Sequence, residues 1–407
     1  MSRQVSATGR GRQSWRDTAP LLWPSPQQAL AVRRTPPFRS KPGATSWWVL
    51  PTAAHPRFFV PVESPGGWRV VARSGAGGRA DQVQALASRL LRTGMGKVLP
   101  IDRFEVAGTG IEQHLQDVLG QPVRIGVRLG RARADRVVVL QVLAADGSTL
   151  AFAKLGTTEI SDARLTSEAS NLSHIADLDP DRVGAPSLLH AGIWADRQIV
   201  VLSAVDSRPQ AADEVPVAPM RRLAEAAGTV ETTLGESDFL ARLRAEVGCV
   251  REAAVRERLD AHLDVITARF ADQVLRFGAW HGDWVPWNMT RDGERVFLWD
   301  WEHYEEGVPI GFDALHFRGQ QLRNADRKHL DRGEDVWWAE RRSLLARLDV
   351  LGVAADLTTV LYLVRVNLRF VIEGQSDQDV SPRRVGWALP LLERTVDQLA
   401  TIGGADV

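Results

Sequence analysis

The chain has 407 residues, of which 44% are hydrophobic and 25% are charged, values typical of a globular protein with more than one domain. Fifty Lys and Arg balance fifty Asp and Glu, so the composition gives no reason to expect nucleic-acid or anionic-membrane binding. Cys249 is the single cysteine, which excludes an intrachain disulfide and a cysteine-based metal site. No apolar run approaches the roughly 18 residues of a membrane span, and no apolar block of a secretory signal accompanies the N-terminal arginines. We therefore expect a cytoplasmic protein without a membrane span.

The N-terminal third contains two segments of different character. Residues 1–45 carry seven Arg and one Lys against the single acid Asp17, and six prolines interrupt any regular element, so we expect a basic, disordered tail. Residues 46–120 contain short apolar segments separated by Pro and Gly, followed by a helical pattern over 82–91. We expect this part to be an N-terminal extension packed on the domain that begins at 121.

The next part of the chain, 121–205, has the pattern of a small β-rich domain. Apolar-rich runs at 123–129, 137–142, 150–155 and 197–202 predict strands, and Asp146-Gly147 predicts a hairpin turn between the second and third. A helical stripe over 161–175 interrupts them. From 206 to 407 the pattern is mainly helical, for example over 239–247 and 259–270. Residues 364–370 fit a strand as well as they fit a helix.

The densest chemical signal is the segment His281-Gly-Asp-Trp-Val-Pro-Trp-Asn288, followed twelve residues later by Asp300-Trp-Glu302. A turn at 291–294 predicts a hairpin that brings Asp300 back towards this loop. Phosphoryl transfer needs such an array, because Mg²⁺ is held by hard oxygen ligands and a carboxylate accepts the proton of the attacking hydroxyl. Asp283 suits the proton acceptor, while Asn288 and Asp300 suit the metal.

This segment resembles the catalytic loop and metal-binding segment of the aminoglycoside phosphotransferase and choline kinase group, small-molecule relatives of protein kinases. The group's pattern is H-G-D-x-x-x-x-N followed by D-x-[DE], and every element is present here. Residues 311–317 also resemble the group's Asp-bearing helix start. The resemblance covers about 121–400 and implies an α+β, bilobal, protein-kinase-like fold, with a β-rich N-lobe joined near 203–207 to a helical C-lobe, preceded by an N-terminal extension. It also implies that nucleotide binds in the cleft between the lobes.

The resemblance further implies a nucleotide-binding lysine and its partner. Lys154, one of only four lysines in an Arg-rich chain, lies in a strand pattern like the one that carries the group's phosphate-binding Lys. Glu168, on the following helix, occupies the place of the Glu that pairs with it. Gly130 and Arg131, in the loop between the first two strands, are candidates for phosphate contact, although this loop departs from G-x-G-x-x-G and fits a plain hairpin loop equally well.

Several residues near the catalytic segment have two interpretations. His281 is a support of the loop or, with Asp283, a metal ligand. Trp284 and Trp287 are core residues or stack on an acceptor, while Glu302 is an active-site residue by the D-x-[DE] match. Glu305 and Glu306 are solvated, or they add to an acidic patch that would suit an amino sugar or another cation.

We therefore predict a Mg²⁺-dependent kinase that moves the γ-phosphoryl group of ATP or GTP to a hydroxyl of a small polar molecule, a sugar or amino sugar. An aminoglycoside-antibiotic or choline-type kinase is the first alternative. A nucleotide-binding pseudokinase that acts as a partner-binding module is the second, and the irregular glycine loop motivates it. The sequence leaves the acceptor, the choice of nucleotide and the oligomeric state open.

Overall fold

The computed structural model describes residues 15–24, 44–72, 88–93, 100–108, 110–129, 137–205, 214–325, 330–376, 392–393 and 396. The chain forms two compact units. Unit 1 contains 1–169 and 187–205, and unit 2 contains 170–186 and 206–407. The predicted α+β class, with a β-rich N-terminal part and a mainly helical C-terminal part, is confirmed. No helix in the described ranges combines the length and the apolar character that a membrane span requires.

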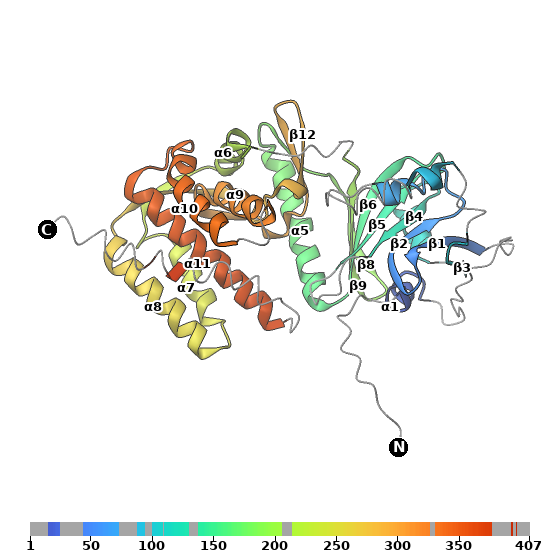
Figure 1. Cartoon of the computed structure of the whole chain (residues 1–407), viewed down its shortest axis with the longest axis horizontal. Helices are drawn as coiled ribbons and strands as arrows, with labels where there is room; N and C mark the ends of the chain where they lie inside the picture. Colours follow the sequence, from blue (N-terminus) through green and yellow to red (C-terminus); the bar gives the residue numbers. More distant parts are fainter. Residues whose placement is uncertain are drawn as a thin grey trace, which may run out of the picture. The chain divides into compact units, whose positions relative to one another are not determined.

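Unit 1 is built on an eight-stranded antiparallel sheet with the order β3-β1-β2-β4-β5-β6-β9-β8 (Figure 1). The predicted hairpin turn is present between β5 and β6, where Gly147 has a φ of 80° and a Cβ would meet the backbone of Gly66. The strands are β1 (Ala44–Thr52), β2 (His55–Pro61), β3 (Arg103–Ala107), β4 (Arg124–Arg128), β5 (Val137–Leu143), β6 (Thr149–Gly156), β8 (Leu188–Trp194) and β9 (Arg197–Ser203). Helices α1 (Trp15–Leu22), α2 (Arg69–Ala72) and α4 (Ile111–Leu119) accompany them.

The sheet joins the expected extension and the expected N-lobe into one unit. β2, β3 and all but the first two residues of β1 come from the segment 46–120, yet β2 pairs with β4 through Phe58–Arg128 and Phe59–Val127. Buried residues of both segments share one core, in which Phe59 and Val127 are both fully buried. The boundary at 120 therefore does not separate two structural bodies.

A described part of the expected tail is a helix. α1 ends at Leu22, two residues before Pro24, and includes Pro20. Trp23 packs against Trp47, with ring centroids 4.7 Å apart, and Nε1 of Trp194 donates to the carbonyl of Leu21 at 2.8 Å. Burial of Leu22 and Trp23 outweighs the poor helix propensity of proline here. The rest of the expected tail, 1–14 and 25–43, lies outside the described residues.

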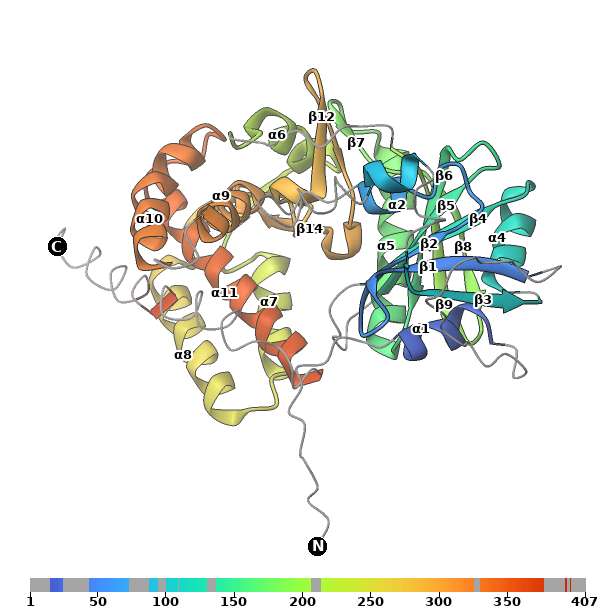
Figure 2. The same cartoon turned by 45° about the vertical axis from the view of Figure 1, so that its right-hand side comes forward.

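Unit 2 is organised around α11 (Gly352–Ser376). This helix contacts α7, α8, α9 and α10 (Figure 2), and almost every side chain from Ala355 to Val364 is buried, as expected of a helix surrounded by others. The ambiguous segment 364–370 therefore belongs to a helix. The other helices are α5 (Glu159–Leu178), which begins in unit 1, α6 (Val217–Ala226), α7 (Asp238–Gly248), α8 (Ala253–Phe270), α9 (Phe312–Ala325) and α10 (Leu330–Ala346).

Two small three-stranded sheets of unit 2 lie on either side of the segment 281–288 in the sequence. One has the order β10-β11-β14 and the other β12-β13-β7. Met289 pairs with Leu298 in the predicted β12–β13 hairpin, which is confirmed. The strands are β7 (Val183–Gly184), β10 (Val230–Thr233), β11 (Val274–Trp280), β12 (Met289–Asp292), β13 (Arg295–Leu298) and β14 (Glu305–Pro309), with 3₁₀ turns η2 (Pro286–Asn288) and η3 (Trp301–His303).

Candidate active site

The segment 281–288 forms a loop between β11 and β12 whose start requires glycine. Gly282 has a φ of 82°, a backbone conformation that side-chain-bearing residues rarely adopt. A Cβ at this position would lie 2.2 Å from the carbonyl oxygen of His303. The middle residue of the His-Gly-Asp motif therefore lets the loop approach η3 closely.

Asp313, in the first turn of α9, holds the loop through two backbone bonds. Its Oδ2 accepts from the N–H of His281 at 2.8 Å, and its Oδ1 accepts from the N–H of Gly282 at 3.2 Å. Burial raises the pKa of Asp313 to about 7, against the opposing effect of these two bonds, and the charge of Asp283 adds to the rise. The carboxyl group is thus a buried support of the loop backbone.

His281 lies beneath the loop rather than at its surface. The side chain is fully buried, and its ring centroid is 4.6 Å from that of Trp301. Burial lowers its pKa to about 3 although Asp283 acts in the opposite direction, so the ring is neutral near pH 7. Its Nδ1 accepts from the N–H of Asp283 at 3.2 Å, which assigns the proton to Nε2. This geometry is that of a support for Asp283.

Asp283 is the carboxylate that the loop presents. Its side chain is 37% exposed, Oδ2 accepts from Nδ2 of Asn288 at 2.8 Å, and Oδ1 lies 3.2 Å from Nε2 of His316. Burial raises the pKa of Asp283, but the hydrogen bond from His316, together with the charge of Arg369, outweighs it and holds the pKa below its ordinary value. The group is therefore an anion at neutral pH, able to accept a proton when a hydroxyl is activated.

His316 and Tyr362 form a second layer behind Asp283. Burial lowers the pKa of His316 more than Asp283 raises it, so the ring is neutral. Because the anionic Asp283 can only accept, Nε2 of His316 carries the proton, and Nδ1 accepts from the hydroxyl of Tyr362 at 3.1 Å. The chain Tyr362–His316–Asp283 fixes one orientation of the carboxylate.

Asn288 and Asp300 lie at the base of the same hairpin. The N–H of Trp299 donates to the carbonyl of Asn288 at 3.2 Å, so the two ends of the hairpin are adjacent. Asp300 has a φ of 66°, a left-handed conformation that is uncommon for a residue other than glycine and is concentrated at functional sites. Since Nδ2 of Asn288 binds Asp283, its Oδ1 is the side-chain atom left for a cation.

This pair fits Mg²⁺ by its chemistry. One amide oxygen and one carboxylate are hard ligands, and Mg²⁺ commonly takes one or two carboxylates together with phosphate oxygens and water. Within the described ranges, no group of three or more His, Cys, Asp or Glu side chains could hold a metal ion. The two-residue set is therefore suited to an ion that a bound phosphate helps to hold.

In unit 1, the predicted pair of Lys154 and Glu168 is present. Nζ of Lys154, on β6, lies 2.6 Å from Oε1 and 2.8 Å from Oε2 of Glu168, on α5. Glu168 is buried and Lys154 is 12% exposed. A buried carboxylate that holds the ammonium with both oxygens restricts a long flexible side chain to one position. The candidates Gly130 and Arg131 lie outside the described residues.

Three residues were expected near an acceptor, and for Trp284 the structure contradicts this expectation. Trp284 is fully buried, with its ring centroid 6.3 Å from that of His281, so it packs beneath the loop and has no surface to offer an acceptor. Trp287 is 42% exposed and stays a candidate. Glu302 lies in η3 with Oε1 3.3 Å from Nε2 of His303, and both line a cavity in unit 2.

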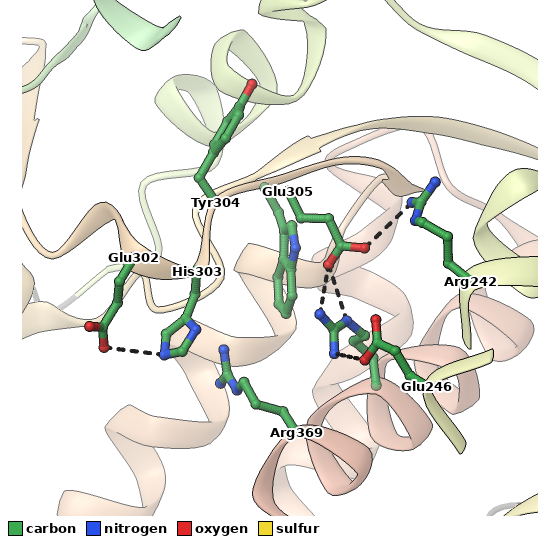
Figure 3. A pocket seen from close by; sticks show the side chains of 9 residues that line it. Arg242, Glu246, Glu302, His303, Tyr304, Glu305 and Arg369 are labelled. Atoms are coloured by element: carbon green, nitrogen blue, oxygen red, sulfur yellow. Dashed lines mark hydrogen bonds and ion pairs between the residues drawn. The ribbon is translucent and has the colours of Figure 1, made fainter. Parts of the chain in front are cut away.

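This cavity, of about 260 Å³, adjoins the loop 281–288 (Figure 3). Trp280, directly before the loop, lines it together with side chains from η3, β14, α7 and α11. Nη1 of Arg369, on α11, donates to the carbonyl of Gly282 at 2.7 Å, which connects the cavity wall to the loop. The cavity is therefore a candidate acceptor site.

Sequence reasoning missed part of this arrangement. His316 is three residues past Asp313, a spacing that places both on one face of α9, and this could have associated it with the loop. Tyr362 and Arg369 lie in a long apolar helix with no local motif, and only the packing of α11 brings them to the loop.

Known proteins resemble the chain in structure but not in sequence. No family model matches the sequence, and no curated protein matches it. Solved structures that resemble it include a thermostable mutant of aminoglycoside phosphotransferase APH(4)-Ia, with 13% identity over 71% of this chain and 99% of that one and a TM-score of 0.49. Choline kinase LicA from Streptococcus pneumoniae has 13% identity over 72% and 98%, with a TM-score of 0.46. A putative fructosamine-3-kinase from Haemophilus somnus has 12% identity over 71% and 96%, with a TM-score of 0.36.

Proposed function

We propose that the chain is a kinase that transfers the γ-phosphoryl group of ATP or GTP to a hydroxyl of a small polar molecule such as a sugar. The observation that carries this proposal is the geometry around Asp283, an anionic, partly exposed carboxylate held by Asn288 and His316. Such a group is suited to accept a proton from a hydroxyl.

In the proposed reaction, Asp283 orients the acceptor hydroxyl and takes its proton as the oxygen attacks the γ-phosphorus. The new bond joins the acceptor oxygen to phosphorus, the bond between the γ-phosphorus and the bridging oxygen breaks, and the nucleoside diphosphate leaves. Lys154, held by Glu168, binds phosphate oxygens of the nucleotide. Asn288 and Asp300 would hold Mg²⁺, which neutralises phosphate charge when it is bound.

Two alternatives differ from this proposal, one in the acceptor and the other in the absence of phosphoryl transfer. An aminoglycoside-antibiotic or choline-type kinase would differ only in the acceptor. A nucleotide-binding pseudokinase would bind Mg-ATP without turning it over, and the geometry of Asp283 and its partners speaks against that possibility.

The test is a screen for ADP release from Mg-ATP over a set of hydroxyl compounds, with a mass measurement of each product. A phosphorylated product is heavier than its acceptor by about 80 Da, the mass that the transferred group adds. We expect at least one acceptor to give stoichiometric ADP and phosphorylated product. Thermal stabilisation by Mg-ATP without ADP release from any acceptor would support the pseudokinase.

A further inference from the structure

Two of the three acidic side chains that line the cavity of unit 2 are already bound by arginines. Oε2 of Glu305 accepts from Nε of Arg365 at 3.1 Å and from Nη2 at 3.0 Å, and its Oε1 lies 3.4 Å from Nη2 of Arg242. Nη1 of the same Arg365 donates to Oε2 of Glu246 at 3.0 Å. The expected acidic patch is therefore neutralised within the protein at Glu305.

Glu302, the third acid of the cavity, has a partner of its own. Its Oε1 lies 3.3 Å from Nε2 of His303, and the same ring nitrogen lies 3.8 Å from Glu373. Each of the three cavity carboxylates thus has a nitrogen donor beside it. A cationic acceptor would have to compete with these internal contacts.

Arg369 differs from the other arginines of the cavity. Its Nη1 donates to the carbonyl of Gly282, and its guanidinium carbon lies 5.9 Å from the ring centroid of Trp280. In the part of the chain that the structure describes, Arg369 forms no ion pair with a carboxylate, and Figure 3 shows no dashed line to it from any other side chain drawn there. Its charge does act at longer range on Asp283 and Asp313, where it lowers the pKa of each carboxyl group. Of its five N–H donors, one binds the loop, which leaves four for another partner.

We infer that Arg369 is the binding site for an anionic group of the acceptor, a carboxylate or a phosphate. The planar guanidinium binds such groups through two parallel hydrogen bonds, and the aromatic face of Trp280 limits its movement. Its contact with Gly282 places the anion beside the loop residue that precedes Asp283. This inference rests on the proposed function for the hydroxyl that reacts, and it adds the charge of the compound that carries the hydroxyl.

Arg369 also disfavours an acceptor with a positive charge. A cation in the cavity would lie near the guanidinium of Arg369, which no described carboxylate contacts directly, and like charges brought together in a partly buried site repel. The structure thus predicts an order among compounds of similar shape: anionic acceptors first, neutral ones next and cationic ones last.

Four hexoses of one shape test this order. Glucose is neutral, glucuronate carries a carboxylate, glucose 6-phosphate carries a phosphate and glucosamine carries an ammonium group. Binding of each to the full chain is measured by calorimetry, and ADP release is measured with Mg-ATP. We expect glucuronate or glucose 6-phosphate to bind at least about tenfold more tightly than glucose, the effect of one hydrogen bond to a charged group, and glucosamine to bind most weakly. Comparison of glucuronate with glucose 6-phosphate shows whether a carboxylate or a phosphate is preferred.

Two variants of Arg369 separate a binding role from support of the loop. Arg369→Gln should remove the preference for the anion over glucose, and Arg369→Lys, which keeps the charge, should restore part of it. Loss of support for the loop alone would lower turnover of all hexoses equally and leave their ratio unchanged. Arg244→Gln is the matched control, because Arg244 lies on α7 with its own partner Asp264 at 3.0 Å.

The outcomes are distinct from those of the proposed function. Anion-selective binding that depends on Arg369, without ADP release from any of the four hexoses, would support this site, while the proposed function would still be decided by the wider screen of hydroxyl compounds. Glucosamine binding as tightly as either anion, no measurable binding of both anions at millimolar concentration, or an anion preference that survives in Arg369→Gln would each overturn the inference.

Discussion

The position of Asp283 depends on side chains that do not themselves face an acceptor. His316 donates to Oδ1 and Asn288 donates to Oδ2, while Tyr362 fixes the tautomer of His316 from behind. Since one hydrogen bond to a charged group contributes about 1.5–3 kcal/mol, the loss of one partner is expected to change both the orientation and the basicity of the carboxylate. The two carboxyl groups of this site, Asp283 and Asp313, can each be tested through the pH at which they titrate.

The first prediction concerns His316. His316→Ala removes a donor that lowers the pKa of Asp283, so this pKa should rise and the acid limb of the kcat/KM profile should move to higher pH. We expect kcat to fall by about tenfold or more, with the KM for nucleotide little changed. Tyr362→Phe should have a smaller effect in the same direction, because the donor remains and only its tautomer is less fixed. An acid limb that stays in place in His316→Ala would show that the ring does not act on Asp283.

The second prediction concerns Asp313 and stability. The pKa of about 7 lies above the ordinary value of 3.8, so the folded chain retains a proton that the unfolded chain has lost. The contribution of this group to stability is therefore fully present below about pH 4 and is lost as the pH rises through 7. The stability of the wild type relative to Asp313→Asn should fall between pH 5 and 7 by up to about 1.4 kcal/mol per pH unit. Urea unfolding across this range measures it, and a difference independent of pH would contradict the assignment.

Among the helices and strands, the site depends on pairs of elements that are close together in the sequence. β6 and α5 meet at Lys154 and Glu168, and the β12–β13 hairpin brings the residues beside Asn288 and Asp300 together. Both contacts span few residues, because thirteen residues lie between Lys154 and Glu168, and two residues join β12 to β13. Contacts made by Arg369 and Tyr362 span many more, and no local pattern indicates them.

For the ion pair, we predict that Lys154→Arg raises the KM for nucleotide and lowers kcat by at least about tenfold, or about 1.4 kcal/mol. The guanidinium keeps the charge but is larger and planar, and the carboxylate of Glu168 is fitted to a compact ammonium. Glu168→Gln should act less strongly, because the lysine remains charged. The double variant should cost less than the sum of the two single ones, since both changes break one unit. Steady-state kinetics of the four proteins test this, and a silent Lys154→Arg would exclude a role in nucleotide binding.

For the hairpin, we predict that Asp300→Ala abolishes Mg²⁺-dependent nucleotide binding, because it removes the charged ligand of the proposed ion. Asn288→Ala should weaken Mg²⁺-dependent nucleotide binding less, since water can replace a neutral ligand. It should also lower kcat, because Nδ2 of Asn288 donates to Asp283. Titration of Mg²⁺ against nucleotide binding gives the order of the two variants. The same Mg²⁺ requirement in Asp300→Ala as in the wild type would exclude the assignment.

For the whole molecule, the sequence predicted the order of a β-rich and a helical part, and the boundary that it suggested at residue 120 falls within one sheet. The strands of the expected extension complete a single sheet with the expected N-lobe, and Trp23 from the expected tail packs in the same core. Pairing between β2 and β4 joins residues about 70 positions apart, and only tertiary burial shows it. Unit 2 also includes 170–186, so the chain changes unit three times, whereas the sequence indicated one junction. The proximity of Asn288 and Asp300 could be predicted more easily, because one hairpin joins them.

Proton transfer to Asp283 during phosphoryl transfer is the step on which the proposed activity depends, and the kcat of Asp283→Asn measures it. We predict a fall of about 10²–10⁴-fold, the usual contribution of general base catalysis, with the dissociation constant for Mg-nucleotide preserved. Asp292→Asn is the matched control, because Asp292 is an exposed residue of the same hairpin. A kcat of Asp283→Asn equal to that of the control, in a folded protein, would contradict the role of Asp283 as proton acceptor.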